Sequence, residues 1–213
     1  MEKGKTPDIR RIILLLTDIL VVLSVTWSVT GMATIRSEGL LVSGGWSAFK
    51  YYTVLSNVFC ALACFASAIC CMVRKTHVLP KGLYLFRLMG SSVVSVTFVV
   101  VLIFLGPLYG YGPMFSGVCF WLHLFAPVMG IAGQIACEPE KPMPVKSTFW
   151  ALVPTFAYGC FYIGVNAAGW TGTADPKTDF YAFLRWGWAV GILMFMVVFL
   201  INWLAAFILA KRK

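Results

Sequence analysis

Six long apolar stretches constrain this chain more than any other feature of its sequence. Each approaches or exceeds the ~20 helical residues needed to cross a hydrocarbon core about 30 Å thick. Of the 213 residues, 60% are hydrophobic and only 12% are charged, whereas soluble domains carry roughly 25% charged residues. We therefore expect an all-α, polytopic membrane protein with spans at residues 12–34, 51–73, 83–105, 115–136, 148–165 and 186–210.

The spans are expected to be helices because lipid offers no partner for open backbone groups, and the stretches lack the alternation of barrel strands. The fifth span is the weakest, since it is short and Pro154 interrupts it. Connections are brief, and the longest, 166–185, is rich in loop-forming residues. We expect a single transmembrane domain, residues 1–213, built as one bundle of six helices.

The distribution of lysine and arginine predicts the orientation of the bundle. Four basic residues belong to one side (Arg36, Lys50, Lys177 and Arg185), and twelve belong to the other (Lys3, Lys5, Arg10, Arg11, Arg74, Lys75, Lys81, Lys141, Lys146, Lys211, Arg212 and Lys213). This asymmetry predicts that both termini are cytoplasmic. We assign the net charge of +9 to orientation, and expect no nucleic-acid partner. Asp18 within the first apolar run indicates a retained helix, not a cleaved signal peptide.

The motifs of soluble enzymes are absent from the sequence. It contains no nucleophile elbow, no phosphate-binding loop and no zinc-protease motif. The seven cysteines lie in or beside the spans without metal-binding spacing, so we interpret them as small packing residues. Cys70 and Cys71 are alternative palmitoylation sites. No metal or other cofactor is expected, and any chemistry must come from polar residues inside the membrane.

One face of the second span carries polar and small residues at helical spacing. These are Thr53, Asn57, Cys60 and Cys64, and Ser56 borders them. Such a face normally turns toward neighbouring helices, so interhelical packing is one interpretation. Tyrosines near span ends, Tyr52 among them, are expected to anchor the membrane interface.

The fourth span contains His123, on a stripe that also includes Cys119 and Pro127. Histidine is the side chain best suited to proton transfer near neutral pH, and inside a membrane it needs a partner. A structural histidine with a satisfied hydrogen bond is the alternative. Haem ligation by two histidines is not expected, because His77, the other histidine of the chain, lies in a loop.

These residues resemble a known family. Residues 50–57 read Lys-Tyr-Tyr-Thr-x-x-Ser-Asn, and His123 is followed by a proline in the same helix. Both features are similar to the androgen-induced-gene group, which includes the androgen-dependent TFPI-regulating protein and small bacterial relatives. The resemblance implies six helices and hydrolysis of fatty acid esters of hydroxy fatty acids. It also implies Thr53 as nucleophile, His123 as base and, for a bacterial relative, the cytoplasmic membrane as location.

The chain departs from the animal pattern after the histidine, where residues 124–126 are apolar instead of polar. Thr53 and His123 would lie on helices that begin at the same face of the membrane, at depths that differ by about 9 Å. We expect them to share one pocket, with Ser56 and Cys119 beside it. With no carboxylate available, Asn57, Tyr109 or Tyr111 is expected to orient the imidazole, and no oxyanion donor is identified.

Two further expectations concern charge and function. Asp18 and Arg87 lie at similar depths from the cytoplasmic face, which predicts a buried ion pair, the alternative being a role with lipid headgroups or protons. The expected function is hydrolysis of a membrane lipid ester. The alternative is a non-enzymatic protein, either a small transporter or a lipid-binding or sensor module; the absence of a visible internal repeat disfavours the transporter.

Overall fold

Six helical rods dominate the computed structural model, which describes residues 8–34, 44–169 and 178–210. Each is long and apolar enough to cross a membrane, and they run Ile9–Thr34, Tyr52–Arg74, Lys81–Tyr109, Gly117–Ala136, Val145–Ala168 and Trp188–Ala210. These are the six predicted spans with small shifts at their ends. The chain is therefore a multi-pass membrane protein, as the composition predicted.

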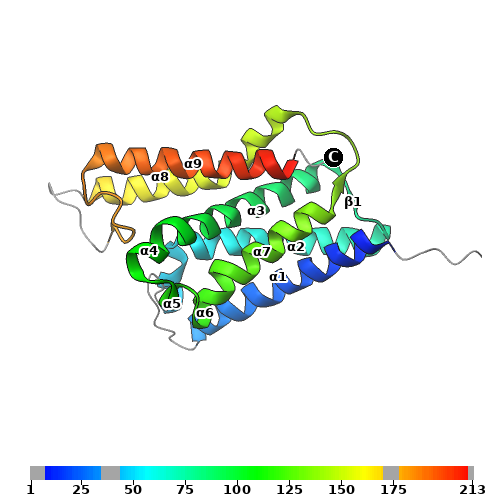
Figure 1. The fold of residues 1–213 in the computed structure, drawn as a ribbon, viewed down its shortest axis with the longest axis horizontal. Coiled ribbons are helices and arrows are strands. Elements are labelled where there is room, and N and C mark those ends of the chain that lie inside the picture. Colours follow the sequence, from blue (N-terminus) through cyan, green and yellow to red (C-terminus); the bar gives the residue numbers. More distant parts are fainter. Residues whose placement is uncertain (1–7, 35–43, 170–177, 211–213) are drawn as a thin grey trace, which may run out of the picture.

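Four helices form the centre of the bundle: α1 (Ile9–Thr34), α2 (Tyr52–Arg74), α3 (Lys81–Val100) and α7 (Ala126–Ala136). α1 packs against α2 and α7, and α3 packs against the same two helices. A short 3-10 helix, η4 (Val145–Leu152), leads into the hairpin of α8 (Val153–Ala168) and α9 (Trp188–Ala210). Figure 1 shows this hairpin in yellow, orange and red beside α3, on the side away from α1.

The helices pack through regular stripes of small and polar side chains. The buried residues of α1 include Leu14, Asp18, Val21, Val25, Ser28 and Met32, and those of α2 include Thr53, Asn57, Cys60, Cys64, Ser67 and Cys71. Both series alternate steps of four and three, which keeps one face of a helix toward its neighbour. The predicted polar face of the second span is therefore an interior face.

Two π-helical turns interrupt the spans, and each precedes a proline. η2 (Val101–Leu105) lies before Pro107, and η3 (Trp121–Phe125) lies before Pro127. Proline has no N–H, and its ring crowds the carbonyl four residues earlier, which widens the helix there. For Pro127 that earlier residue is His123. Pro154 behaves differently, because it occupies the first turn of α8, where a missing N–H costs little.

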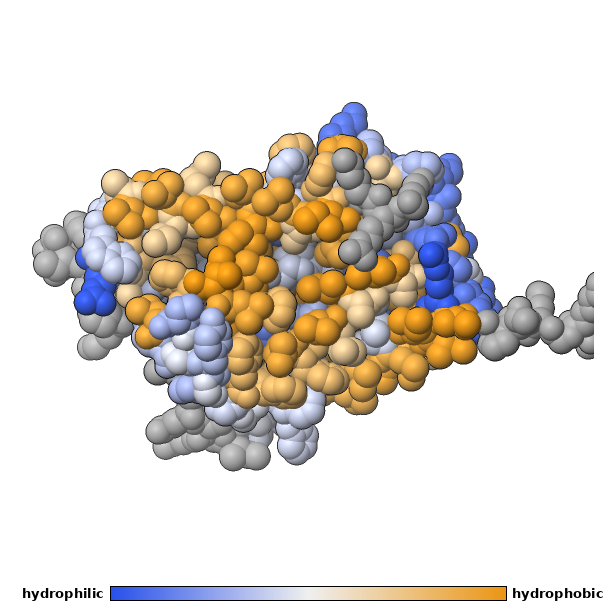
Figure 2. Space-filling view, viewed as in Figure 1, coloured by the Kyte–Doolittle hydropathy of each residue, from blue (hydrophilic) through white to orange (hydrophobic). Residues whose placement is uncertain are grey.

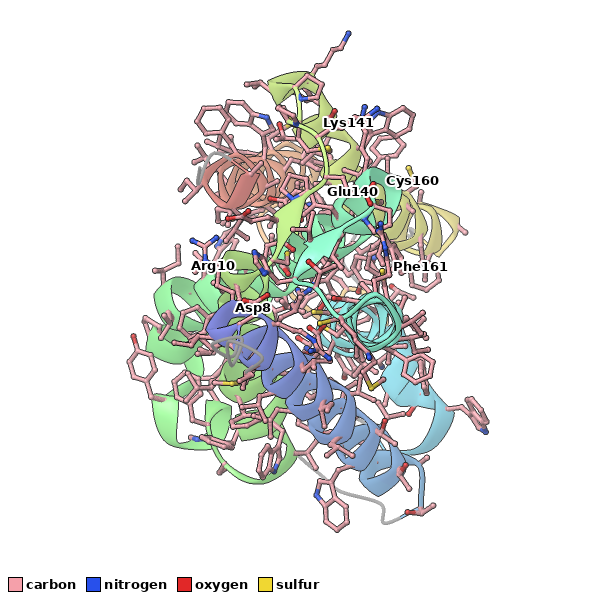
Figure 3. The ribbon with its side chains drawn as sticks, turned by 90° about the vertical axis from the view of Figure 1, so that its right-hand side faces the viewer. Asp8, Arg10, Glu140, Lys141, Cys160 and Phe161 are labelled. Atoms are coloured by element: carbon pink, nitrogen blue, oxygen red, sulfur yellow. The ribbon has the colours of Figure 1, made fainter. Side chains whose placement is uncertain are left out.

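One end of the bundle is closed by a two-residue parallel strand pair, β1 (Val78–Leu79) with β2 (Glu138–Pro139). The start of α1 joins this end through ion pairs from Arg10 to Glu138 and from Asp8 to His77. Figure 3 looks onto this end, with Asp8 and Arg10 labelled. The start of α1 and the C-terminal end of α9 point toward this same end in Figure 1.

The opposite end carries short helices and loops. They are η1 (Gly45–Lys50), α4 (Gly106–Tyr109), α5 (Tyr111–Met114), α6 (Gly117–Phe120) and the segment 178–187. Between the two ends, apolar side chains cover the flanks of the bundle, and hydrophilic residues gather at the end with the strand pair (Figure 2). Seven of the basic residues used to predict orientation lie outside the described residues (Lys3, Lys5, Arg36, Lys177, Lys211, Arg212 and Lys213).

The predicted ion pair between Asp18 and Arg87 is present in the centre of the bundle. Their side chains are 0% and 1% exposed, and Arg87 Nη2 contacts Asp18 Oδ1. Arg87 Nη1 also donates weakly to Ser91 Oγ at 3.3 Å and to the Gly130 carbonyl at 3.4 Å. Gly133 makes room for the guanidinium, because a Cβ there would overlap Arg87 Nη2. The ion pair therefore links α1 to α3, and its guanidinium packs against α7.

Candidate functional site

Among the described residues, the hydroxyl of Thr53 differs from most buried hydroxyls of the bundle, and it shares the lack of a hydrogen bond with Ser67, which lies outside the cavity described below. Buried serines and threonines elsewhere, such as Thr17, Ser28 and Ser95, donate to carbonyls of their own helix at 2.7–3.0 Å. Within the described residues, Thr53 Oγ1 makes no such bond, although the residue is only 9% exposed. Thr53 stands in the first turn of α2 and lines a small cavity. Its oxygen is therefore available to another group.

The Thr53 cavity lies between α2 and α3 on one side and the α8–α9 hairpin on the other. Its volume is about 50 Å³, room for one or two water molecules. Its walls are mainly valine, leucine and phenylalanine side chains, into which five hydroxyl-bearing residues besides Thr53 are set (Tyr52, Thr97, Thr155, Tyr158 and Tyr181). The Thr53 hydroxyl therefore faces a small, mainly apolar space between the helices.

A larger apolar groove adjoins this cavity. It has a volume of about 490 Å³ and lies between α2, α3 and α8. Phe49, Leu55, Phe59 and Phe161 contribute to its walls, and Tyr52 and Tyr158 line both the groove and the Thr53 cavity. Along α2 the groove extends from Tyr52 to Leu62, a rise of about 15 Å. Its size, shape and lining suit an acyl chain.

His123 occupies the π-helical turn of the fourth span and is 2% exposed. Its Nδ1 lies 2.8 Å from the carbonyl oxygen of Met114. A carbonyl only accepts hydrogen bonds, so Nδ1 carries the proton and Nε2 of the neutral ring keeps a free lone pair. The Met114 carbonyl thus fixes the tautomer and the orientation of the ring.

Two sets of contacts link the residues around Thr53 to those around His123. Asn57, one turn after Thr53, donates through Nδ2 to the Thr53 carbonyl at 2.7 Å and to the carbonyl of Leu122 at 2.9 Å. Leu122 directly precedes His123. On the other side, Leu105 lines the Thr53 cavity and packs against Met114, which holds the imidazole. Leu105 and Met114, here called the Leu105 layer, thus connect the Thr53 cavity to His123.

Several details of the expected site need correction. His123 is absent from the lining of the Thr53 cavity, so the two do not share a pocket in this structure. The reason is the bond to Met114, which holds the ring on its own side of the Leu105 layer. Asn57 does not orient the imidazole, because both its bonds run to backbone carbonyls. Tyr109 is 36% exposed in α4 and is not the partner of His123.

Ser56 and Cys119 lie close to the site in different ways. Ser56 lines the acyl-sized groove, and its hydroxyl bonds Thr97 Oγ1 at 3.0 Å. Cys119 is buried in the apolar cluster between α1 and α2, with Leu122 and Val54. Ser56 therefore remains a pocket residue, whereas Cys119 is a packing residue.

A tyrosine network around Thr53 was not foreseen from the sequence. The Tyr52 N–H donates to the Tyr181 hydroxyl at 2.8 Å, and Tyr52 Oη bonds Thr155 Oγ1 at 2.8 Å. Tyr158 donates to the Lys50 carbonyl at 2.8 Å. Tyr52 was expected to be an interface anchor, and only its position before Thr53 could have pointed to this role. Tyr181 and Thr155 are distant in sequence and carried no signal.

In comparisons with known proteins, no protein-family model, curated protein or solved structure matches this chain. Among the described residues, no group of three or more His, Cys, Asp or Glu side chains is arranged to hold a metal ion. The polar groups at the described site are hydroxyls, one imidazole and backbone groups.

Proposed function

We propose that the protein is a membrane-embedded hydrolase of lipid esters of the fatty-acyl class, with Thr53 as nucleophile and His123 as general base. The observation that carries this proposal is the unbonded Thr53 hydroxyl, which opens into a cavity beside an acyl-sized groove. A threonine kept only for packing would bond its own helix, as Thr17 does. The resemblance to the androgen-induced-gene group agrees with the same two residues.

The reaction would proceed by acyl transfer. The acyl chain lies in the groove, and the ester passes between Tyr52 and Tyr158 to reach Thr53. Thr53 Oγ1 attacks the carbonyl carbon while Nε2 of His123 takes its proton, and the carbonyl π electrons move to oxygen. The C–O bond of the ester then breaks, and the alcohol leaves with the proton from His123. Water repeats the cycle on the acyl-threonine, releasing the fatty acid.

The protonation of the ring supports His123 as the base. With Nδ1 donating to Met114, Nε2 is the atom able to accept the threonine proton. Transfer requires Nε2 to come within about 2.6–3.2 Å of Oγ1, or to act through one water. A side-chain shift in the Leu105 layer, where the cavity and His123 adjoin, would bring the two together when substrate binds. Catalytic hydrogen bonds often tighten only in the substrate complex.

The membrane setting forms part of the proposal. The asymmetry of the basic residues supports a cytoplasmic location for both termini, and Thr53 would then lie in the outer half of the bilayer. We assign the protein to the bacterial cytoplasmic membrane, and its partner is a membrane lipid that enters the groove sideways from the bilayer.

The test is labelling of the purified protein in detergent with an alkyl fluorophosphonate, alongside hydrolysis of p-nitrophenyl octanoate. Thr53→Val keeps the shape of the side chain and removes the hydroxyl, so labelling and hydrolysis should both disappear. Thr148→Val is the matched control, because Thr148 is also buried but bonds the Val145 carbonyl at 2.7 Å and lies outside the cavity. Full labelling and activity in Thr53→Val would exclude the hydrolase.

A second candidate function is lipid binding without hydrolysis. The separation of His123 from the Thr53 cavity favours it, because a binding site needs the groove and no base. Under this alternative, acyl lipids would copurify with the protein and be displaced by filling the groove, for example with Ala157→Trp. The protein would then hydrolyse no ester, and substituting Thr53 or His123 would leave the background rate of hydrolysis unchanged.

A further inference from the structure

Hydrolysis of an ester at Thr53 would place negative charge on the carbonyl oxygen, and that charge needs a hydrogen-bond donor. Donors aimed at a developing oxyanion supply a large part of the catalysis in acyl-transfer enzymes. The sequence offered none, because no asparagine, lysine or arginine could be assigned to the position. The cavity, however, is lined by several hydroxyl groups whose bonds differ.

Most of these hydroxyls are engaged in bonds with other groups. Tyr158 donates its proton to the Lys50 carbonyl. Thr97 pairs with Ser56 at 3.0 Å, and Tyr52 Oη pairs with Thr155, which also accepts from Asn202. Each of these groups is held in a structural bond between helices.

The Tyr181 hydroxyl differs, because its bond to the backbone makes it an acceptor. It accepts the N–H of Tyr52 at 2.8 Å and lies against the backbone of Thr53, which places it at the N-terminus of α2. Its own proton is left for donation, and Tyr158 lies beside it in the wall of the same cavity. Accepting a hydrogen bond polarises a hydroxyl and makes it a stronger donor.

The position of the Tyr181 hydroxyl also has a favourable field. Tyr52 and Thr53 are the first residues of α2, a helix of 23 residues, and N–H groups of a first turn have no partner within the helix. The partial positive charge at this end stabilises a nearby anion. The unbonded Thr53 hydroxyl faces the same cavity, so a tetrahedral carbon on Thr53 would carry its oxyanion beside Tyr181.

Given the proposed hydrolase function, we propose that Tyr181 is a catalytic residue whose hydroxyl donates a hydrogen bond to the oxyanion formed at Thr53. The Tyr52 N–H and the start of α2 hold and polarise that hydroxyl. The segment 178–187, which joins the α8–α9 hairpin, thus contributes directly to the site. The ring is fixed for this task by contacts with Tyr51, Tyr162 and Phe183, at centroid distances of 6.0, 5.9 and 5.5 Å.

The ionisation of Tyr181 is consistent with a donor. Burial raises the pKa of the Tyr181 hydroxyl above its usual value near 10, so the phenol stays protonated at neutral pH. The hydroxyl is therefore in the form that a donor requires. A phenolate at this position would repel an oxyanion.

The test compares Tyr181→Phe with the unaltered protein in hydrolysis of p-nitrophenyl octanoate. Removing one oxyanion donor lowers kcat by about 100–1000-fold in other enzymes, and KM should change little because the ring and groove remain. Tyr111→Phe is the matched control, since Tyr111 donates to the Leu102 carbonyl at 2.8 Å and lines neither the groove nor the Thr53 cavity. Its kcat should equal that of the unaltered protein.

A second measurement separates catalysis from folding. An octyl trifluoromethyl ketone would add to Thr53 as a tetrahedral oxyanion, whereas the matching methyl ketone binds without forming one. Tyr181→Phe should weaken inhibition by the first ketone and leave the second unchanged. Because both ketones are measured on one preparation, the ratio of their inhibition constants does not depend on the fraction of folded protein.

The outcomes distinguish the two proposals. If Thr53→Val is inactive while Tyr181→Phe retains full kcat and an unchanged ketone ratio, the hydrolase stands and Tyr181 is not its oxyanion donor. If Thr53→Val is fully active, the hydrolase and the role of Tyr181 are both excluded. A fall in kcat with a matching loss of trifluoromethyl ketone selectivity supports the donor.

Discussion

The buried pair of Asp18 and Arg87 allows a quantitative prediction about stability. Asp18→Asn removes the charge that neutralises Arg87 while keeping the size of the side chain. Arg87 would keep only its long bonds to Ser91 and Gly130, at 3.3 and 3.4 Å. The Arg87 side chain is only 1% exposed. Breaking such a pair from one side costs about 3–5 kcal/mol, because a buried charge is left uncompensated.

The assay is thermal unfolding in detergent, followed by the fluorescence of a thiol-reactive dye. At about 2–4 °C per kcal/mol for a chain of this size, Asp18→Asn should lower the apparent Tm by about 6–20 °C. Arg87→Gln should have a similar effect. The double variant should recover part of the loss, because removing both partners leaves no unpaired charge.

The surface ion pair of Arg74 and Glu140 provides the control. Its side chains are 43% and 38% exposed, so Arg74→Gln should cost no more than about 1 kcal/mol. Strictly additive losses for Asp18→Asn and Arg87→Gln would refute the reasoning. A loss in Asp18→Asn no larger than that of the surface variant would also refute it.

Three further predictions concern catalysis, pH and topology. Thr53→Ala and His123→Ala should each abolish hydrolysis of p-nitrophenyl octanoate, and the double variant should be no worse than either, because the two act as a unit; a further loss in the double variant would mean independent roles. The hydrogen bond from His77 lowers the pKa of Asp8 below its usual 3.8. The stability that Asp8 contributes should therefore be present above that value and be lost as the pH falls through the lower folded-state pKa; a difference in Tm between the unaltered protein and Asp8→Asn that grew on acidification would contradict this. Reporter tags at both termini should be found in the cytoplasm, and a tag on the opposite side would overturn the assigned orientation.

Periodicity made much of the membrane architecture predictable from the sequence. The spacing of Thr53, Asn57, Cys60 and Cys64 indicated an interior face of the second span, and the structure buries all four. Asp18 and Arg87 could be paired because charges in lipid must find each other, and their depth follows from counting residues along a helix. These inferences needed only the rise of a helix and the properties of the bilayer.

The details of the candidate site depend on features that leave little trace in a sequence. The partner of His123 is the carbonyl of Met114, and every residue has a carbonyl. Tyr181 is 129 residues away from Tyr52, in a connection that was expected only to join two spans. His123 lies in a π-helical turn before Pro127, and regular helical spacing does not anticipate such a turn. Long-range and backbone contacts therefore limited the prediction.

The π-helical turn at residues 121–125 has a consequence for how this chain tolerates change in length. A π turn holds one more residue than an α-helical turn, and one residue of a regular helix corresponds to a rotation of about 100°. Deleting one residue of 121–125 would let the turn become regular α-helix, and its four remaining residues would cover about the rotation that five cover now. α6 would then keep its alignment with α1 and α7, whereas the side chains within the turn, His123 among them, would change direction. The packing of the flanking helices therefore tolerates the loss of one residue here, but the position of the imidazole does not.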